Sequence, residues 1–343
     1  CWRIDKLANR ITFNRELIAL RMIAEAAGYA NDTAGKMQVE KRPGQILVEA
    51  LTGCTSSFGN APLAQLCAQC VAPMAAPVAS AVSRQLNESQ RAAVALGSTQ
   101  ALTLVQGPPG TGKTKVALTI LLAWVHSNCY REPILATSGS NIAVDNLLEG
   151  LANAGVRVVR LGRPDSVRPE LMQHCLDMAP GGPDLDAAGQ QMGYEQRMLQ
   201  LRRAQVICAT CVGVGSDVLD RMRFPAVLID EATQASESTS LVALCRGAQQ
   251  LVMLGDQYQL PPTVIASHPA AAAAGQPLFN RLLHEGLPSH MLDTQYRMHP
   301  ALSQLPSDLI YGGNLQDGVS AAERPTPPGF AWPRPEWPVA LLP

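Results

Sequence analysis

Three short segments of this 343-residue chain carry side chains that could act on a phosphate group. Residues 107–114 read GPPGTGKT, which fits the spacing G-x-x-x-x-G-K-[ST]. Asp230 and Glu231 end the apolar run AVLIDE, and residues 255–262 read GDQYQLPP. Each segment follows a run rich in Val, Ile and Leu, so we expect all three to lie at the ends of buried strands.

The first segment has the composition of a phosphate-binding loop. Its glycines let successive backbone N–H groups converge on phosphate oxygens, and the helix expected to begin there adds partial positive charge. Lys113 is expected to reach the β- and γ-phosphates of ATP, and the Thr114 hydroxyl to bind Mg²⁺. The residues predicted to hold the nucleotide in this loop are Gly107, Pro108, Pro109, Gly110, Thr111, Gly112, Lys113 and Thr114.

The two adjacent acids suit metal-assisted hydrolysis of a phosphoanhydride. We expect Asp230 to hold Mg²⁺ through water, and Glu231 to orient and deprotonate the attacking water. Gln259, in the third segment, could sense the γ-phosphate. Taken alone, the acids could form an acidic turn and the third segment an ordinary turn, so the prediction depends on all three segments lying together.

Short apolar runs alternate with helical segments from residue 86 onward, which predicts an α/β fold with a parallel sheet. The runs are ALTLVQ, PILATS, VRVVRLG, AQVICAT, AVLIDE and QLVMLGD. We expect an N-terminal helical region and connector over residues 1–85, the sheet-bearing domain over 86–305, and a linker with the start of a further domain over 306–343. A partly helical insertion is expected over 164–203, where the alternation is interrupted.

An amphipathic helix is predicted near the N-terminus. Phe13, Leu17, Leu20 and either Ile23 or Ala24 recur there at helical spacing and would form its apolar face.

The charge of the chain is close to balanced, with 27 Lys and Arg against 28 Asp and Glu. This excludes a strongly basic nucleic-acid binder, so any nucleic-acid site must be a local patch. Arg157, Arg160, Arg163 and Arg168 form one such enrichment, and a solvated protein face is the equally weighted alternative.

Nine cysteines are scattered along the chain. Cys67-x-x-Cys70 and Cys208-x-x-Cys211 have the spacing of metal half-sites, but buried reduced thiols are the preferred interpretation.

No apolar run reaches the ~20 residues of a membrane span, and the N-terminus lacks a signal-peptide pattern. We therefore expect a soluble cytoplasmic protein, with a nuclear location also open.

Further segments accompany the three described first, in a fixed order. LNESQRAAV precedes the phosphate loop, SGSNIAVDNLLEGL and DEATQASE follow it, and GDQYQLPP comes before LDTQYRMHP. Over most of residues 86–318 these segments resemble the motifs of superfamily 1 helicases of the up-frameshift type. The resemblance implies a RecA-like P-loop NTPase domain with ATP and Mg²⁺ as cofactors. It also implies 5′-to-3′ movement on single-stranded RNA or DNA, driven by ATP hydrolysis, in RNA surveillance by nonsense-mediated decay.

The resemblance assigns roles to further residues. Gln90 would recognise adenine, Tyr296 would stack on the base, and Arg297 would contact the γ-phosphate. Gln259 would couple the state of the nucleotide to movement.

Ser140 and Asn141 would contact the nucleic-acid backbone, again by resemblance. A serine before a helix is also a good N-cap, and the two interpretations carry equal weight.

Helicases of this group carry a second RecA-like domain, which supplies an arginine finger worth ~10³–10⁵ in rate. No such segment occurs in these 343 residues. We therefore expect the chain to be a fragment, with the second domain of its parent as a partner, and to hydrolyse ATP poorly alone. A non-motor module that binds ATP and RNA is the main alternative. A P-loop ATPase or kinase unrelated to nucleic acid is a third, disfavoured by LNESQRAAV and by QYRMHP.

Overall fold

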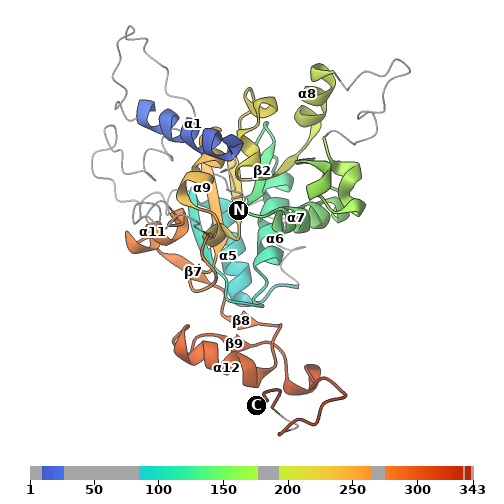
Figure 1. The fold of residues 1–343 in the computed structure, drawn as a ribbon, viewed down its shortest axis with the longest axis vertical. Helices are drawn as coiled ribbons and strands as arrows, with labels where there is room; N and C mark the ends of the chain where they lie inside the picture. Colours follow the sequence, from blue (N-terminus) through green and yellow to red (C-terminus); the bar gives the residue numbers. More distant parts are fainter. Residues whose placement is uncertain (1–9, 27–84, 177–192, 264–274, 335–336, 341–343) are drawn as a thin grey trace, which may run out of the picture.

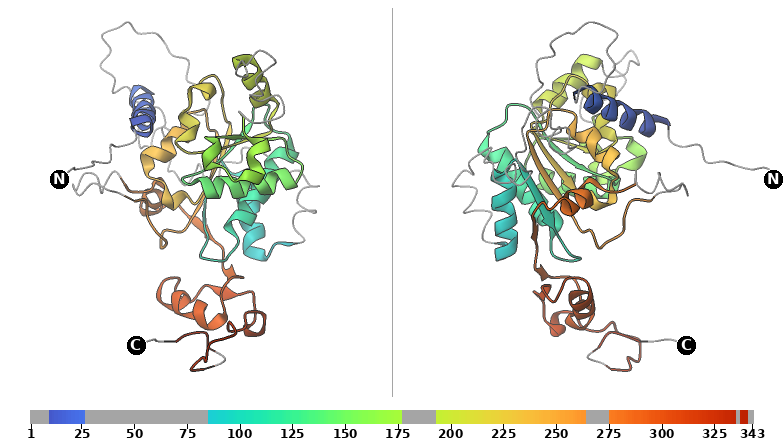
Figure 2. Two further views of the ribbon diagram at one scale, coloured as in Figure 1. Left: turned by 45° about the vertical axis from the view of Figure 1, so that its right-hand side comes forward. Right: turned by 90° about the vertical axis from the view of Figure 1, so that its left-hand side faces the viewer.

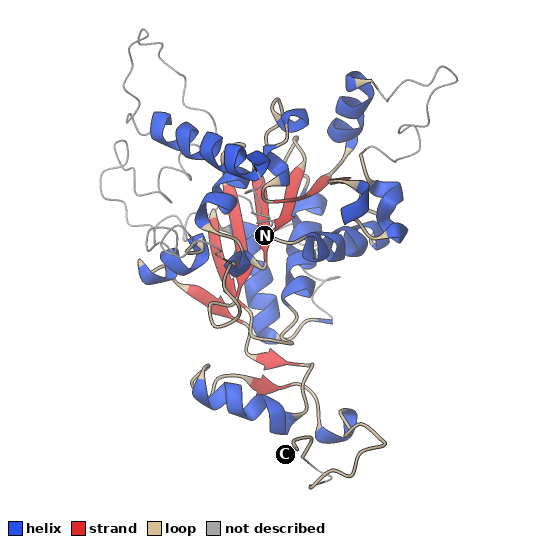
Figure 3. Cartoon of the chain, viewed as in Figure 1, coloured by secondary structure: helices blue, strands red, loops and turns tan. Residues whose placement is uncertain are grey.

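The computed structural model describes residues 10–26, 85–176, 193–263, 275–334 and 337–340. Its main body is a seven-stranded sheet with helices on both faces, and a smaller lobe lies below it (Figure 1, Figure 3). The strands of the sheet are β1 (Leu102–Gln106), β2 (Ile134–Ser138), β3 (Val158–Leu161), β4 (Val206–Thr210), β5 (Ala226–Asp230), β6 (Gln250–Gly255) and β7 (Ser289–Met291). Their order is β3-β4-β2-β5-β6-β1-β7, and all neighbours are parallel. The predicted α/β fold is confirmed.

Two layers of helices cover the sheet, one on each face (Figure 2). One layer contains α5 (Glu88–Thr99), α6 (Lys113–Ser127) and α7 (Asn141–Asn153). The other contains α1 (Arg10–Ala26), α8 (Tyr194–Arg203), α9 (Glu237–Leu244) and α11 (Leu278–His284). Among the described helices, none is both long enough and apolar enough to cross a membrane.

Strand β5 shows why the predicted strands read as continuous apolar runs. Ala226 and Leu228 pack into the cluster on the α6 side, whereas Val227 and Ile229 pack into the cluster on the α9 side. Successive side chains of a strand point to opposite faces, so a strand covered on both faces needs apolar residues at every position. The six predicted runs correspond to β1 to β6 for this reason.

Helix α1 confirms the predicted helix, and only part of its apolar face is buried. Ile23 is buried, but Phe13 is 59% exposed and Leu20 is 45% exposed. Polar contacts set the rotation of the helix, since Thr239 on α9 donates to Glu16 at 2.6 Å and Arg15 donates to the carbonyl of Val212 at 3.1 Å.

Cys208 and Cys211 lie buried at the end of β4. Burial raises the pKa of the Cys208 thiol to about 12 and that of the Cys211 thiol to about 11. Both thiols therefore stay protonated at neutral pH and pack as small apolar groups, in line with the preferred interpretation. Cys67 and Cys70 lie outside the described residues.

The lower lobe contains β8 (Thr294–Gln295), β9 (Gln316–Asp317) and α12 (Pro300–Leu309). Strand β8 pairs with β9 in a separate parallel ladder. The predicted boundary at residue 305 falls inside α12, and the chain leaves the main body before β8 (Figure 1). A short 3-10 helix, η7 (Ala321–Glu323), follows β9.

The described part of the predicted insertion lies between β3 and β4. It consists of the 3-10 helices η2 (Pro164–Ser166) and η3 (Pro169–His174), together with α8. Three further 3-10 helices belong to the main body: η4 (Gly213–Gly215), η5 (Asp217–Leu219) and η6 (Ala232–Gln234).

The structure corrects one interpretation of the arginine enrichment. Arg160 on β3 is fully buried, and its Nε donates to Asp145 on α7 at 3.0 Å. Its other donors reach the carbonyl of Leu161 and the Oδ1 of Asn141. Arg160 therefore ties the sheet to α7 and contributes to no basic surface, because strand alternation turns it inward.

This buried ion pair makes a testable prediction for stability. Arg160→Ala leaves the Asp145 carboxylate buried without its counterion, so we expect the free energy of unfolding to fall by about 3–5 kcal/mol. Arg168→Ala is the matched control, since its pair with Glu149 is exposed and is worth at most about 1 kcal/mol. Urea unfolding followed by circular dichroism measures both, and equal losses would contradict this assignment.

Candidate functional site

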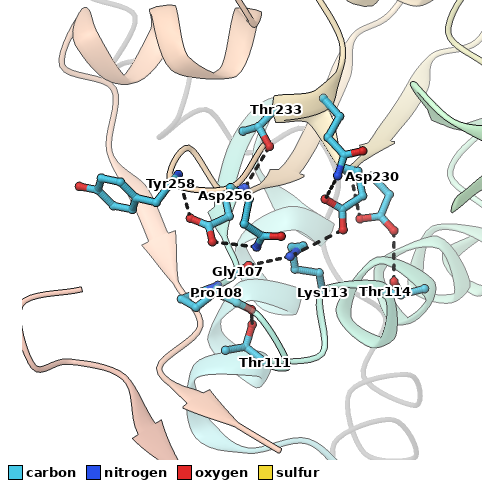
Figure 4. A network of polar contacts seen from close by, with 12 residues as sticks. Gly107, Pro108, Thr111, Lys113, Thr114, Asp230, Thr233, Asp256 and Tyr258 are labelled. Carbon is cyan, nitrogen blue, oxygen red and sulfur yellow. Dashed lines mark hydrogen bonds and ion pairs between the residues drawn. The ribbon is translucent and has the colours of Figure 1, made fainter. Parts of the chain in front are cut away.

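The phosphate loop joins β1 to α6 at the carboxyl edge of the sheet. The backbone N–H of Gly107 donates to the carbonyl of Gly255 at 2.9 Å, which extends the β1–β6 ladder into the loop. Lys113 is buried, and its Nζ donates to the carbonyl of Gly107 at 2.7 Å (Figure 4). The ammonium group thus lies within the loop, at the start of α6, where phosphate oxygens are stabilised.

Glycines are required at two positions of this loop. Gly110 has φ +78° and Gly112 has φ +83°, a left-handed region that side chains rarely adopt. A Cβ on Gly110 would lie 2.6 Å from the Cβ of Arg297, and a Cβ on Gly107 would lie 2.1 Å from the Cγ of Lys113. The loop is therefore packed against the lower lobe and folded closely around its own lysine.

Asp230 and Glu231 face this loop from the end of β5. The Asp230 carboxylate accepts from the Thr114 hydroxyl at 3.3 Å and from the backbone N–H of Glu231 at 3.0 Å (Figure 4). Glu231 Oε1 lies 3.7 Å from Lys113 Nζ, and Oε2 accepts from Gln234 at 3.2 Å. The structure therefore brings Lys113, Thr114 and both acids together, as the sequence predicts.

Glu231 has a left-handed backbone, with φ 51° and ψ 43°. A non-glycine residue in this region stores strain of the order of 1 kcal/mol or more, and such strain is concentrated at functional sites. The conformation turns the chain sharply after β5, so that Asp230 and Glu231 both reach the phosphate loop. Two consecutive residues of a straight strand would point to opposite faces.

The protonation of Asp230 reflects its surroundings. Burial, and then the neighbouring Glu231 carboxylate, raise the pKa of Asp230 to about 6. The backbone N–H of Glu231, the Lys113 ammonium and the Thr114 hydroxyl oppose this rise. A cation close to Asp230 would favour its ionised form.

Gln259 lies in the turn after β6, close to the loop but directed elsewhere. Its Nε2 donates to the Oδ2 of Asp256 at 2.8 Å. Asp256 is buried, and its backbone N–H donates to the Thr233 hydroxyl at 3.3 Å (Figure 4). The turn after β6 is thus joined to the turn that carries the acids.

Gln90 and Tyr296 lie on the other side of the loop. Gln90 forms a capping box with Asn87 at the start of α5, and its Nε2 donates to the carbonyl of Thr111 at 2.9 Å. Tyr296 donates its backbone N–H to the carbonyl of Gly110 at 2.9 Å, and its hydroxyl accepts from Asn87 at 2.9 Å. Asn87 therefore connects the two residues predicted to contact the base.

Arg297 is exposed, and its Cβ lies beside Gly110 of the phosphate loop. Its backbone is fixed from two sides, because its N–H donates to Gln295 at 2.8 Å and its carbonyl accepts from Arg324 at 3.0 Å.

Ser140 and Asn141 lie at the start of α7, after β2. Ser140 Oγ accepts from the N–H of Ala143 at 3.3 Å, so the N-cap interpretation is confirmed. Asn141 is exposed, although its Oδ1 accepts from the buried Arg160 at 2.9 Å. Contact of these residues with nucleic acid stays a prediction.

Several further residues shape the site without having been expected from the sequence: Asn87, Thr233, Asp256, Arg324 and Tyr311. The spacing of Asn87 and Gln90 fits a capping box and could have revealed Asn87. The contacts of the other four join segments far apart in the sequence, which no local pattern reveals.

Comparison with known proteins adds to this geometry. The AAA domain family matches residues 85–180 and 185–267, and a second AAA domain profile matches residues 274–343. Regulator of nonsense transcripts 1 of Caenorhabditis elegans is 41% identical over 278 residues, which cover 74% of this chain and 26% of that protein. ATP-dependent helicase upf1 of Schizosaccharomyces pombe is 38% identical over 285 residues, covering 74% of this chain and 31% of that protein.

These relatives confirm the resemblance to up-frameshift-type helicases that the motifs indicated. The chain spans 21% to 31% of the length of such relatives. Among solved structures, the match to the arterivirus helicase nonstructural protein 10 covers 68% of this chain and 44% of that chain. It shares 15% identity with a TM-score of 0.41, which is too low to support the fold.

The raised pKa of Asp230 makes a prediction for the metal-free chain. Folded Asp230 binds its proton more tightly than the unfolded value of 3.8 allows, so its contribution to stability falls as pH rises from about 4 to about 6. Asp230→Asn cannot ionise, and we expect it to be more stable than the parent by about 1–3 kcal/mol near pH 7.5, but not near pH 4. Urea unfolding in a chelator measures this, and a difference independent of pH would contradict the assignment.

Proposed function

This chain belongs to the AAA domain family, and from that premise we propose that it is the first motor domain of an ATP-dependent helicase. The parent protein hydrolyses ATP and moves 5′ to 3′ along single-stranded RNA. One observation carries the proposal: the phosphate loop meets the acid pair, with Lys113 3.7 Å from Glu231 and Thr114 3.3 Å from Asp230. A loop that only bound phosphate would have no need of the acids.

The names of the relatives support RNA as the substrate, since they are regulators of nonsense transcripts. The parent protein then acts in the surveillance of such transcripts, and a cytoplasmic location, with a nuclear one as the alternative, is part of this proposal. Single-stranded DNA is the second candidate substrate, and the experiment below includes it.

The loop binds the triphosphate of ATP. Its backbone N–H groups and the N-terminus of α6 face the phosphates, and Lys113 neutralises charge on the β- and γ-phosphates. Lys113 exchanges its contact with the carbonyl of Gly107 for phosphate oxygens, which are stronger acceptors for an ammonium group.

The residues at this edge of the sheet fit Mg²⁺. The Thr114 hydroxyl and the Asp230 carboxylate are hard oxygen donors 3.3 Å apart, at a buried position next to a second acid. When bound with ATP, the metal supplies positive charge to the β- and γ-phosphate oxygens. Asp230 then stays ionised and holds that charge in place.

Glu231 acts as the general base for hydrolysis. Gln234 holds one oxygen of its carboxylate, and Lys113 attracts the other, so the group is oriented toward the loop. Glu231 accepts a proton from the water that attacks the γ-phosphate. The products are ADP and inorganic phosphate.

Gln90, Tyr296 and Arg297 bind the remainder of the nucleotide. Tyr296 is 38% exposed and offers a ring face for the adenine, while Gln90 hydrogen-bonds its edge. Arg297 reaches the γ-phosphate from beside Gly110. Gln90 must then share its amide between the base and the loop carbonyl that it contacts in this structure.

The nucleic acid lies along the carboxyl edge of the sheet, near the start of α7. Ser140 and Asn141 contact its backbone there, because both are solvent-accessible at a helix N-terminus, where phosphate is favoured. These contacts carry no sequence information, which suits an enzyme that moves along any strand.

A second motor domain packs against the lower lobe. Leu302, Leu305 and Leu309 on α12 are 39%, 65% and 75% exposed. Their spacing of three and four residues forms one apolar stripe, and such a stripe is stabilised by a covering element. This supports a parent chain in which a second domain closes over the nucleotide.

A non-motor module that binds ATP and RNA without separating strands is the second candidate. The exposed stripe on α12 and the complete acid pair favour the motor, because a binding module requires neither feature.

Two substitutions separate binding from turnover. Lys113→Ala should weaken nucleotide binding about 10- to 100-fold, the range expected for hydrogen bonds from a charged group. Glu231→Gln should leave binding unchanged and lower turnover by roughly 10²–10⁴. Calorimetric titration with an ATP analogue and a phosphate-release assay measure the two effects. Equal loss of binding in both variants would exclude Glu231 as the base.

The proposed function is tested by the ATPase rate of this chain, with and without poly(U) or single-stranded DNA. A longer piece of the parent protein, which contains this chain and about 300 further residues, roughly two domains, is measured beside it. We expect polymer-stimulated turnover only in the longer protein, with poly(U) the stronger activator. Equal turnover by the short chain would show a self-contained ATPase, and binding of RNA without turnover in either would favour the non-motor module.

A further inference from the structure

The strongest unassigned feature is the buried carboxylate of Asp256, in the turn after β6. Asp256 is fully buried, and within the described residues no lysine or arginine pairs with it. Its Oδ2 accepts from the Gln259 amide at 2.8 Å and from the Tyr311 hydroxyl at 2.7 Å. A buried carboxylate without a counterion depends on such donors, so each of them affects the other.

Tyr311 comes from a different part of the molecule. It follows α12 in the lower lobe, 55 residues along the chain from Asp256, and it is buried. Burial, and then the hydrogen bond to Asp256, raise the pKa of Tyr311 well above its usual value. The hydroxyl therefore stays protonated and serves as the donor. The rings of Tyr258 and Tyr311 pack edge to face, with their centroids 5.7 Å apart.

The same aspartate is fixed to the acid-bearing turn. Its backbone N–H donates to Thr233, two residues beyond Glu231, and a Cβ on the preceding Gly255 would lie 2.8 Å from the Thr233 side chain (Figure 4). Asp256 thus contacts the acid turn, the turn of Gln259 and the lower lobe. No other described carboxylate in the site joins all three.

We propose that Tyr311 is a positioning residue that sets how readily Gln259 leaves Asp256 to contact the γ-phosphate. This deepens the proposed function, and it rests on that function and on the role expected for Gln259 from the sequence, which is to sense the γ-phosphate. The Tyr258 backbone N–H donates to Asp256 Oδ1 at 3.3 Å throughout. When Gln259 turns away, Oδ2 keeps Tyr311 as its donor, so this oxygen is not left without a partner. Without the Tyr311 hydroxyl, Gln259 would be the remaining side-chain donor and would be held more tightly.

The direction of the effect follows from this sharing of one oxygen. Tyr311→Phe should leave the affinity for ADP unchanged, because ADP has no γ-phosphate to attract Gln259. It should weaken the binding of a non-hydrolysable ATP analogue several-fold. Turnover in the parent protein should fall about tenfold, the low end of what a hydrogen bond to a charged group supplies.

Tyr130→Phe is the matched control. Tyr130 also loses a hydroxyl hydrogen bond, to Gln250, but at the opposite end of β6 from the site. We expect the control to keep both the turnover and the ratio of ADP to ATP-analogue affinity. A control that changed as much as Tyr311→Phe would show a general loss of stability and overturn the proposal.

A double-mutant cycle with Gln259→Ala decides whether Tyr311 acts through Gln259. We expect Tyr311→Phe to have no further effect on turnover or on the affinity ratio once Gln259 is removed. Additive effects, or an unchanged ratio in Tyr311→Phe alone, would overturn the proposal. If the unmodified parent shows no polymer-stimulated turnover, the proposed function fails, and the affinity ratio in this chain still decides the role of Tyr311.

Discussion

The whole site depends on three neighbouring strands that end at the same edge of the sheet. β5, β6 and β1 are adjacent and parallel, with Gln106 opposite Gly255 and Ile229 opposite Met253. Because parallel strands share one carboxyl edge, the three turns that follow them are held within hydrogen-bonding reach. The bond from Gly107 to Gly255 continues the ladder past the end of the sheet. The turns after β1 and β6 therefore cannot shift apart without breaking this backbone hydrogen bond.

The charges at this edge are buried and only partly balanced. The Lys113 ammonium shares its site with two carboxylates. Burial, and then the Glu231 carboxylate, raise the pKa of Asp230 above that of a free aspartate. By contrast, Arg160 and Asp145, on the far side of β2, form a closely paired contact. A structural ion pair is complete within the fold, whereas a buried group with a perturbed pKa beside a phosphate loop is a candidate functional group. The balance of charge alone therefore distinguishes the cluster of Lys113, Asp230 and Glu231 from the pair of Arg160 and Asp145.

Much of this architecture could be predicted from the sequence, because its signals lie in short, continuous stretches of the chain. Strands covered on both faces must be apolar at every position, and a phosphate loop needs its glycines and lysine at fixed spacing, so β1 to β6 and the acid pair could be predicted. β7 could not, because Ser289–Met291 is a short edge strand without an apolar run. The burial of Arg160, the strained backbone of Glu231 and the bond from Tyr311 to Asp256 depend on contacts across space, which no periodicity encodes.

The Tyr296–Arg297 pair lies between two glycines. A Cβ on Gly110 would strike the Cβ of Arg297, and a Cβ on Gly318 would lie 2.2 Å from the ring of Tyr296. Evolution therefore cannot vary these positions independently. A lineage that kept the tyrosine and arginine would be held to glycine at both sites, whereas one that lost the aromatic ring would be free to replace Gly318. Across descendants, an intact or eroded glycine pair would record whether selection still maintains this contact.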